Sequence, residues 1–479
     1  MDNKKDLLLI KTHHTRLKWL PMGLMYIAQA AENIGAKVRI IDLSLEHNHK
    51  KALTSALREN RPCLAGIGGM YTEFEEVKEI AAIIKEVMPK IPVVAGGPLT
   101  AALAKECLAD NNIDIVSLRE GESTIQNLLR YIDGKIELSE IKGIVFRKNE
   151  ELFFTETRPI EDINAIPIPA WHLIDPYVYT STNDNWFGIS QLKMLNVVPA
   201  RGCPYSCIFC DKNVFGQKWR GRNPKNIADE MIMLRDKYGT EAIMFLDDIF
   251  DVDKKWVSNF IEEMQLRNIQ MRWGCSSRIN HADYELYKKM RNAGCCYIFY
   301  GIEFGSDEML KKTNKQVTLA QVDKAVEIAK KAGLRVIGAY MFGMLDETEE
   351  QIKQTIKSAL NSKVDVGGAS VLTPIAGTAL FDMALKSGKI NPDNEWWKAT
   401  RANAHINLTK NVSNKKLAYL ASKAYWMLFW TRPSRKLPRW FCNLMQHFFY
   451  IFGPISGDKF INFIFWLDSL RRKLHLRLP

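Results

Sequence analysis

Long apolar runs are absent from this sequence. None reaches the roughly 20 residues that a helix needs to cross a membrane, so no membrane-spanning segment is predicted. The N-terminus also lacks the apolar segment of a secretory signal. Cysteine is scarce, at nine of 479 residues. We therefore expect a globular protein of the reducing cytoplasm, where thiolate ligands persist. The length predicts two or three domains.

The first 410 residues carry almost no net charge, although the whole chain carries +12. Residues 411–479 hold twelve lysines and arginines against two acidic residues, an excess of ten. A nucleic-acid-binding protein would carry its basic residues on a face near its active site. Here they are concentrated in the tail and interleaved with aromatic residues, so no nucleic-acid partner is predicted.

Three of the nine cysteines form a CxxxCxxC run: Cys203, Cys207 and Cys210. Three thiolates on one short loop can each bind one iron of a four-iron cluster, which leaves the fourth iron open for another ligand. A structural zinc site is the alternative. It would need a fourth ligand at regular spacing, and no CxxC pair follows. The spacing therefore favours an iron–sulfur cluster with metal-ligating roles for all three cysteines.

Residues 1–135 alternate short apolar strands with helices, which predicts a Rossmann-like parallel sheet covered on both faces. The strands are expected at Asp6–Lys11, Lys37–Asp42, Cys63–Gly69, Ile91–Gly97 and Ile113–Ser117. Ligands of such sheets bind beyond the carboxyl ends of the strands. Three loops rich in glycine or polar residues lie there, at 68–72, 96–100 and 120–122.

Residues 136–190 are expected to form a linker with a small hairpin, whose strands are Ile144–Arg147 and Glu151–Thr155. Residues 191–400 then repeat a strand–helix pattern, which predicts a partial (β/α)6 barrel of the TIM type with its chemistry at the carboxyl ends of the strands. The six strands are expected at Met194–Ala200, Ala242–Leu246, Met271–Ser276, Tyr297–Glu303, Arg335–Met341 and Gly367–Leu372. The cysteine loop follows the first of them.

This barrel segment resembles the radical S-adenosylmethionine (SAM) superfamily at several points. Besides the cysteine loop, Gly301–Ser306 (GIEFGS) is similar to the family's GIESGS segment. The turns at 342–350 and 373–378 are similar to its GLPGETEE and PxPGT segments. The resemblance implies that the three cysteines are catalytic and hold a [4Fe-4S] cluster. In that family the open iron chelates SAM, and electron transfer cleaves SAM to a 5′-deoxyadenosyl radical.

The same resemblance implies which other residues contact SAM. Glu303 matches a glutamate that helps to hold the SAM ribose or amino group, and Asp247 and Asp248 stand where the family binds the SAM ammonium. Ser277 and Arg278 end the third barrel strand and are expected to contact the SAM carboxylate or ribose. Helix capping or surface solvation is the alternative for the three acidic residues.

The N-terminal sheet resembles the cobalamin-binding domain of a large radical SAM subclass, the class B methyltransferases. The resemblance is carried by the helix start at Pro21 and by three loops, and it implies that these loops bind the cofactor. The residues expected to do so are Gly68, Thr72, Gly96, Gly97, Gly121 and Glu122. The Asp-x-His-x-x-Gly motif that supplies a cobalt ligand is missing. His13 and His14 are expected to be loop residues, so the lower face of cobalt has no assigned ligand.

The resemblance implies a cobalamin-dependent radical SAM enzyme, in most such cases a methyltransferase of an unactivated carbon. Its cofactors would be a [4Fe-4S] cluster, SAM and cobalamin. An electron donor such as ferredoxin or flavodoxin and a small-molecule substrate would be its partners. Two alternatives stay open: a radical SAM enzyme that forms a ring or oxidises its substrate without methyl transfer, and a non-catalytic corrinoid- or SAM-binding regulator.

Residues 401–479 are expected to be helical. A helical cap over the barrel is one interpretation of this region, but a cap does not need ten excess positive charges. Basic–aromatic amphipathic helices favour anionic membrane surfaces, each cation contributing about 1 kcal/mol. The tail therefore predicts peripheral contact with the inner face of the membrane and a lipid-soluble substrate.

Overall fold

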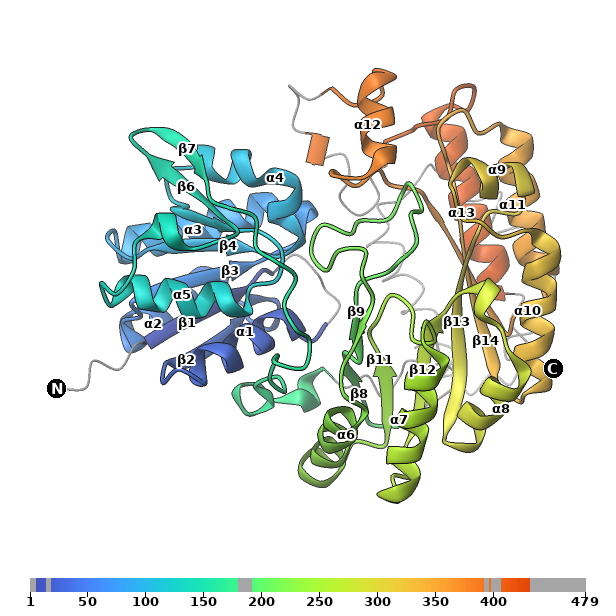
Figure 1. Ribbon diagram of the computed structural model, residues 1–479. Helices are drawn as coiled ribbons and strands as arrows, with labels where there is room; N and C mark the ends of the chain where they lie inside the picture. The colour runs from blue at the N-terminus through green and yellow to red at the C-terminus, as the bar shows by residue number, and fades with distance from the viewer. Residues whose placement is uncertain (1–5, 14–18, 180–191, 392–395, 398–405, 431–479) are drawn as a thin grey trace, which may run out of the picture.

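Two α/β units make up the computed structural model, which describes residues 6–13, 19–179, 192–391, 396–397 and 406–430. A seven-stranded sheet forms the N-terminal unit and a six-stranded sheet forms the second unit, and the two lie side by side (Figure 1). The predicted α/β class is confirmed, with a Rossmann-like sheet followed by a partial barrel.

The N-terminal sheet has the strand order β2-β1-β3-β4-β5-β6-β7. Its first five strands are parallel and sit within a few residues of their predicted positions: β1 (Asp6–Lys11), β2 (Lys37–Asp42), β3 (Leu64–Gly68), β4 (Val93–Gly96) and β5 (Ile115–Ser117). The predicted hairpin forms β6 (Ile144–Lys148) and β7 (Glu151–Phe154). Because β6 pairs antiparallel with β5, the hairpin extends this sheet.

Helices cover both faces of that sheet, as parallel strands require. On one face α1 (Met22–Glu32) packs against α5 (Glu122–Ile132); on the other, α2 (His49–Asn60) and α4 (Pro98–Ala109) flank α3 (Phe74–Val87). The four residues Leu7–Ile10 of β1 are all buried, because they pack alternately against the two helical layers. The helix α2 was not among the predicted elements.

The second sheet is an open, curved barrel with the order β15-β14-β13-β12-β11-β8 and parallel pairing throughout (Figure 1). All six predicted strands are present: β8 (Met194–Val197), β11 (Ala242–Phe245), β12 (Arg272–Ser277), β13 (Cys295–Glu303), β14 (Arg335–Phe342) and β15 (Val366–Val371). The helices between them are α6 (Pro224–Tyr238), α7 (Lys254–Leu266), α8 (Tyr284–Asn292), α9 (Asp307–Lys312), α10 (Leu319–Lys331) and α11 (Glu349–Asn361).

The open edge of the barrel is covered by the last described helix. After α12 (Ala379–Lys386), helix α13 (Asn414–Trp430) lies along β15 and α11. Leu417 and Leu420 pack against Phe342 and Ile352. An uncovered edge strand is prone to pair with other chains, and α13 packs along this one, although Ser370 in β15 stays exposed. The rest of the predicted tail, residues 431–479, lies outside the described residues. Among the helices of the described ranges, none is long and apolar enough to span a bilayer.

Candidate active site

The cysteine loop begins and ends in a two-stranded ladder. Strand β9 (Ala200–Arg201) enters the loop, β10 (Arg220–Gly221) leaves it, and the two pair antiparallel. Gly202 follows directly, with φ +84°, and a Cβ there would lie 2.3 Å from the carbonyl oxygen of Lys218. Only glycine fits both the conformation and the close approach. The ladder and this glycine therefore define the base from which the three cysteines project.

The three cysteine thiols are held away from bulk water. Cys203 is buried, and Cys207 and Cys210 are partly buried. Burial raises the pKa of the Cys203 thiol and raises that of Cys210 to about 12, with the Asp248 carboxylate adding to both shifts. A bound metal would oppose these two shifts, because the thiolate and not the thiol is the metal ligand.

Positive charge does lie beside the thiols. The ammonium of Lys212 opposes the upward pKa shifts of Cys203 and Cys210. Its nitrogen is buried and has no hydrogen-bond partner among the described residues. Within the same residues, no three His, Cys, Asp or Glu side chains converge on the position of one metal ion. A four-iron cluster does not require such convergence, because each cysteine binds a different iron. Three thiols on one loop therefore fit a cluster that leaves one iron open.

Glu303 occupies a strained position at the end of β13. Its φ is +74°, and the pairing of β13 with β14 shifts register between Gly301 and Glu303. A β-bulge of this kind re-aims a side chain, and strain in a non-glycine residue is typical of functional sites. The carboxylate accepts a hydrogen bond from Lys315 Nζ at 2.8 Å. Glu303 thus lies at the carboxyl end of the barrel, as predicted, and is paired with a lysine that the sequence had not suggested.

Asp247 carries an unpaired buried carboxyl group at the end of β11. Neither carboxylate oxygen has a hydrogen-bond partner among the described side chains. Burial raises the pKa of Asp247 well above its usual value, and the charges of Asp248 and Asp251 raise it further. An arriving cation would favour the charged form of this group, so Asp247 fits the predicted contact with the SAM ammonium. Its neighbour Asp248 is exposed.

The remaining two predicted SAM contacts differ in their surroundings. Ser277 Oγ is buried and donates to Asp251 Oδ2 at 2.7 Å, so its hydroxyl is already engaged within the protein. Arg278 lies closer to the cysteines: its Nη1 donates to Cys207 Sγ at 3.6 Å and its guanidinium lies 3.7 Å from the ring centroid of Tyr205. Arg278 also bonds to the carbonyl of Lys315, which connects the cysteine loop with Glu303.

The predicted cobalamin loops meet at the carboxyl ends of β3, β4 and β5. Gly97 has φ +89°, and a Cβ there would lie 3.0 Å from the carbonyl oxygen of Gly69, so the loops after Gly68 and Gly96 touch through backbone. Thr72 lies in the 3₁₀ turn between Met70 and α3 and is partly buried. Glycine-lined, closely packed loops at this end of a parallel sheet fit the binding of a large cofactor.

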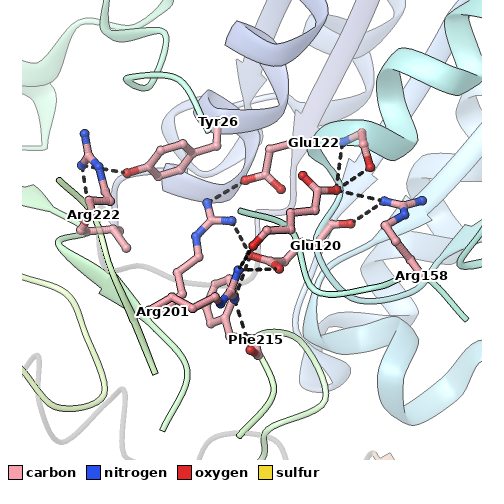
Figure 2. Close-up of polar contacts among 11 residues, drawn as sticks. Tyr26, Glu120, Glu122, Arg158, Arg201, Phe215 and Arg222 are labelled. Carbon is pink, nitrogen blue, oxygen red and sulfur yellow. Dashed lines mark hydrogen bonds and ion pairs between the residues drawn. The ribbon is translucent and has the colours of Figure 1, made fainter. Parts of the chain in front are cut away.

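The third predicted loop, with Gly121 and Glu122, faces the barrel (Figure 2). The Glu122 carboxylate pairs with Arg201 at the base of the cysteine loop, and Glu120 pairs with both Arg201 and Arg220. These arginines were not among the predicted site residues, although Arg201 stands only two positions before Cys203.

Comparisons with known proteins agree with this arrangement. The B12 binding domain family matches residues 10–129, and the Radical SAM superfamily matches residues 197–359. The second match includes the three cysteines, and the first includes the glycine loops. A protein with this fold and this site belongs to the cobalamin-binding radical SAM enzymes.

The relatives place the chain within that family. It is 30% identical to an uncharacterized methyltransferase of Pyrococcus horikoshii over 86% of this chain and 88% of the relative. It is 27% identical to the anaerobic magnesium-protoporphyrin IX monomethyl ester cyclase of Cereibacter sphaeroides, over 76% of this chain and 60% of the cyclase. In fold it is similar to the radical SAM methyltransferase TsrM of Kitasatospora setae, with a TM-score of 0.68 at 18% identity, covering 81% of this chain and 76% of that one. The chain therefore belongs to the cobalamin-dependent radical SAM family, and its predicted enzyme class and cofactors are confirmed at the level of that family.

Proposed function

We propose that this enzyme methylates an unactivated carbon of a small-molecule substrate. The observation that carries the proposal is the contact between the two cofactor loops. Glu122 follows a strand of the N-terminal sheet, and its carboxylate lies 2.6 Å from a guanidinium nitrogen of Arg201, next to the cysteine loop. A second link joins the cysteine loop to the loop that holds Thr72. Burial raises the pKa of Tyr71, next to Thr72, and the charge of Asp211 in the cysteine loop raises it further. Cofactors bound to these loops would face one common space.

The residues divide into two groups by what they would hold. Cys203, Cys207 and Cys210 would hold the cluster, with the Asp247 carboxylate and Glu303 positioned for the SAM ammonium and ribose. The glycines at 68, 96, 97 and 121, with Thr72, would lie against the corrinoid. When bound, these cofactors supply a carbon-centred radical and a transferable methyl group, and the protein supplies binding, orientation and exclusion of water.

A ring-forming or oxidising reaction is the second candidate, and the similarity to the cyclase of Cereibacter sphaeroides favours it. Both reactions would start with the same hydrogen abstraction, and both need a one-electron donor of the ferredoxin or flavodoxin type. They differ in whether SAM also serves as a methyl donor. The by-products therefore distinguish them without knowledge of the substrate.

The test is the content of iron and corrinoid after anaerobic purification with cobalamin supplied, followed by analysis of SAM products. We expect about four irons and one cobalamin per chain, and both S-adenosylhomocysteine and 5′-deoxyadenosine after reduction. Iron and cobalamin with 5′-deoxyadenosine alone would favour the cyclase-like reaction. Iron without cobalamin would overturn the methyl-transfer proposal.

A further inference from the structure

We propose that Arg201 is a positioning residue that fixes the cysteine loop against the N-terminal sheet and so sets the separation of the two cofactors. This inference rests on the proposed function, because it takes the cysteine loop and the glycine loops as the two cofactor sites. The inference also gives Glu120 and Glu122 a structural role, in the contact between the N-terminal sheet and the cysteine loop. We call this contact the joint. The reason is that their carboxylates are already bound by arginine.

The contacts of Arg201 are those of a two-armed clamp (Figure 2). One nitrogen lies 2.7 Å from Glu120 Oε1 and the other lies 2.6 Å from Glu122 Oε1. The exposed fractions of the three side chains are 5%, 4% and 8%. The guanidinium also lies 4.8 Å from the ring centroid of Tyr26 on α1 and 5.1 Å from that of Phe215 in the cysteine loop. Rings and carboxylates together fix both the position and the plane of the guanidinium.

The partner strand of the ladder is held by the same carboxylate. Arg220 pairs with Arg201 across β9 and β10, and its two terminal nitrogens lie 3.1 and 3.2 Å from the Glu120 carboxylate. Arg158 in turn donates to the backbone carbonyl of Glu120 at 2.9 Å, which fixes the glutamate itself. Both ends of the cysteine loop are therefore tied to one residue after β5.

The charges in this joint balance, which argues against a ligand-binding role. Four arginines and four glutamates are present in the network: Arg158, Arg201, Arg220 and Arg222, with Glu120, Glu122, Glu161 and Glu230. No surplus charge is left to attract an ion or a charged cofactor group. Well-packed apolar residues often give as much stability as a buried ion pair, so stability alone does not account for such a network. A rigid fork that joins two carboxylates does provide defined geometry.

The test measures the geometry between the cofactors. Pulsed electron paramagnetic resonance reports the magnetic interaction between the reduced cluster and cob(II)alamin in the holoenzyme. We expect Arg201→Met to keep its iron and cobalamin but to show a broadened interaction, with at least a twofold larger spread of apparent distances. Arg201→Lys keeps the charge but cannot bridge both carboxylates, so it should give an intermediate spread. An unchanged interaction in Arg201→Met would overturn the inference.

Two controls separate a positioning role from general loss of stability. Arg147→Met removes a guanidinium that donates to the backbone carbonyls of Leu108 and Ile113 within the N-terminal unit, and it should leave the interaction unchanged despite a loss of thermal stability. If Arg201→Met does not fold, Glu122→Gln removes one arm of the clamp and should give a smaller broadening. An unchanged interaction in a folded Glu122→Gln protein would then count against the clamp.

A measurement without cofactors tests the clamp even if the proposed function fails. In the cofactor-free chain, amide hydrogen exchange of residues 202–219 should be at least tenfold faster in Arg201→Met than in the wild type. It should be unchanged in Arg147→Met, whose guanidinium lies within the N-terminal unit. Equal exchange in all three proteins would overturn the proposal that Arg201 fixes the cysteine loop. Absence of cobalamin from the wild type would overturn only the proposed function, and the structural role of Arg201 would still stand.

Discussion

The Nη1 atom of Arg278 lies 3.6 Å from the sulfur of Cys207, so a cation borders one of the three cysteines that would hold the cluster. The same guanidinium stacks on Tyr205, between the first two cysteines of the loop. A positive charge at this position would stabilise the more negative, reduced form of a cluster held by these cysteines. Hydrogen bonds to sulfur are among the features that set the potentials of such clusters.

Replacement of Arg278 by methionine should therefore make the cluster harder to reduce. A unit charge several ångströms away, at an effective dielectric constant of about 20, shifts a one-electron potential by on the order of 100 mV. We expect a lower midpoint potential with unchanged iron content, measured by a redox titration followed by electron paramagnetic resonance. Arg278→Lys should recover part of the shift. An unchanged potential in Arg278→Met would show that the guanidinium does not act on the cluster.

Loss of a single loop cysteine should abolish cluster binding. We expect Cys203→Ala to lose most of its iron and all reductive cleavage of SAM, because three thiolates are the minimum for a site with one open iron. Cys63→Ala is the matched control, since that thiol lies in the N-terminal half and should leave both measurements unchanged. Reductive SAM cleavage that persists in Cys203→Ala would exclude the proposed chemistry.

Much of the fold could be predicted because short local patterns in the sequence indicate where its strands and its cysteine loop lie. The buried strands such as Leu7–Ile10 are short apolar runs between helices, and the cysteine spacing marks its own loop. The helix α2 was missed because its sequence, HKKALTSALREN, has few apolar residues and its buried contacts come from only three of them. Tertiary packing decided that element.

The joint between the halves could not be predicted, because no local pattern links its members. Glu120 and Arg201 are 81 residues apart in the chain, and each alone looks like an ordinary charged loop residue. The bulge that re-aims Glu303 likewise depends on its pairing with β14. Patterns of composition indicate where strands end, but the pairing of charges across two sheets comes only from the three-dimensional structure.

Asp247 should contribute to SAM binding through its charge. Asp247→Asn removes the charge but keeps the shape, and a lost charge-assisted hydrogen bond of about 1.5–3 kcal/mol corresponds to a roughly 10- to 150-fold weaker affinity. Anaerobic equilibrium dialysis with SAM would measure this. Asp236→Asn, on the exposed surface of α6, is the control and should bind SAM as the wild type does. Wild-type affinity in Asp247→Asn would remove this residue from the site.

Glu347 should make the stability of the chain depend on pH. Burial raises the pKa of this carboxyl group from 4.5 to about 7, although Oε2 accepts hydrogen bonds from the backbone of Gly343 and Met344 at 2.5 and 2.9 Å. Because the folded pKa is above the unfolded one, the contribution is fully present below pH 4.5 and is lost as pH rises through 7. The loss is up to about 3 kcal/mol.

Glu347→Gln should remove that component, since the amide does not ionise. Thermal unfolding of both proteins between pH 5 and pH 8 would measure the difference. We expect the wild type to lose stability relative to the variant across this interval. Parallel curves would mean that the carboxyl group ionises equally easily in the folded and unfolded chains.

The C-terminal region from residue 411 to residue 479 should bind anionic membranes through its charge. Residues 411–479 carry an excess of ten positive charges between aromatic groups, and each cation near an anionic surface contributes about 1 kcal/mol. Flotation with vesicles containing phosphatidylserine should recover the protein at low salt and release it as salt shortens the range of the attraction. Purely zwitterionic vesicles are the control and should retain much less. If the protein does not float with anionic vesicles at low salt, the predicted membrane contact is wrong. The argument for a lipid-soluble substrate then also fails, because both predictions rest on the charge of the tail.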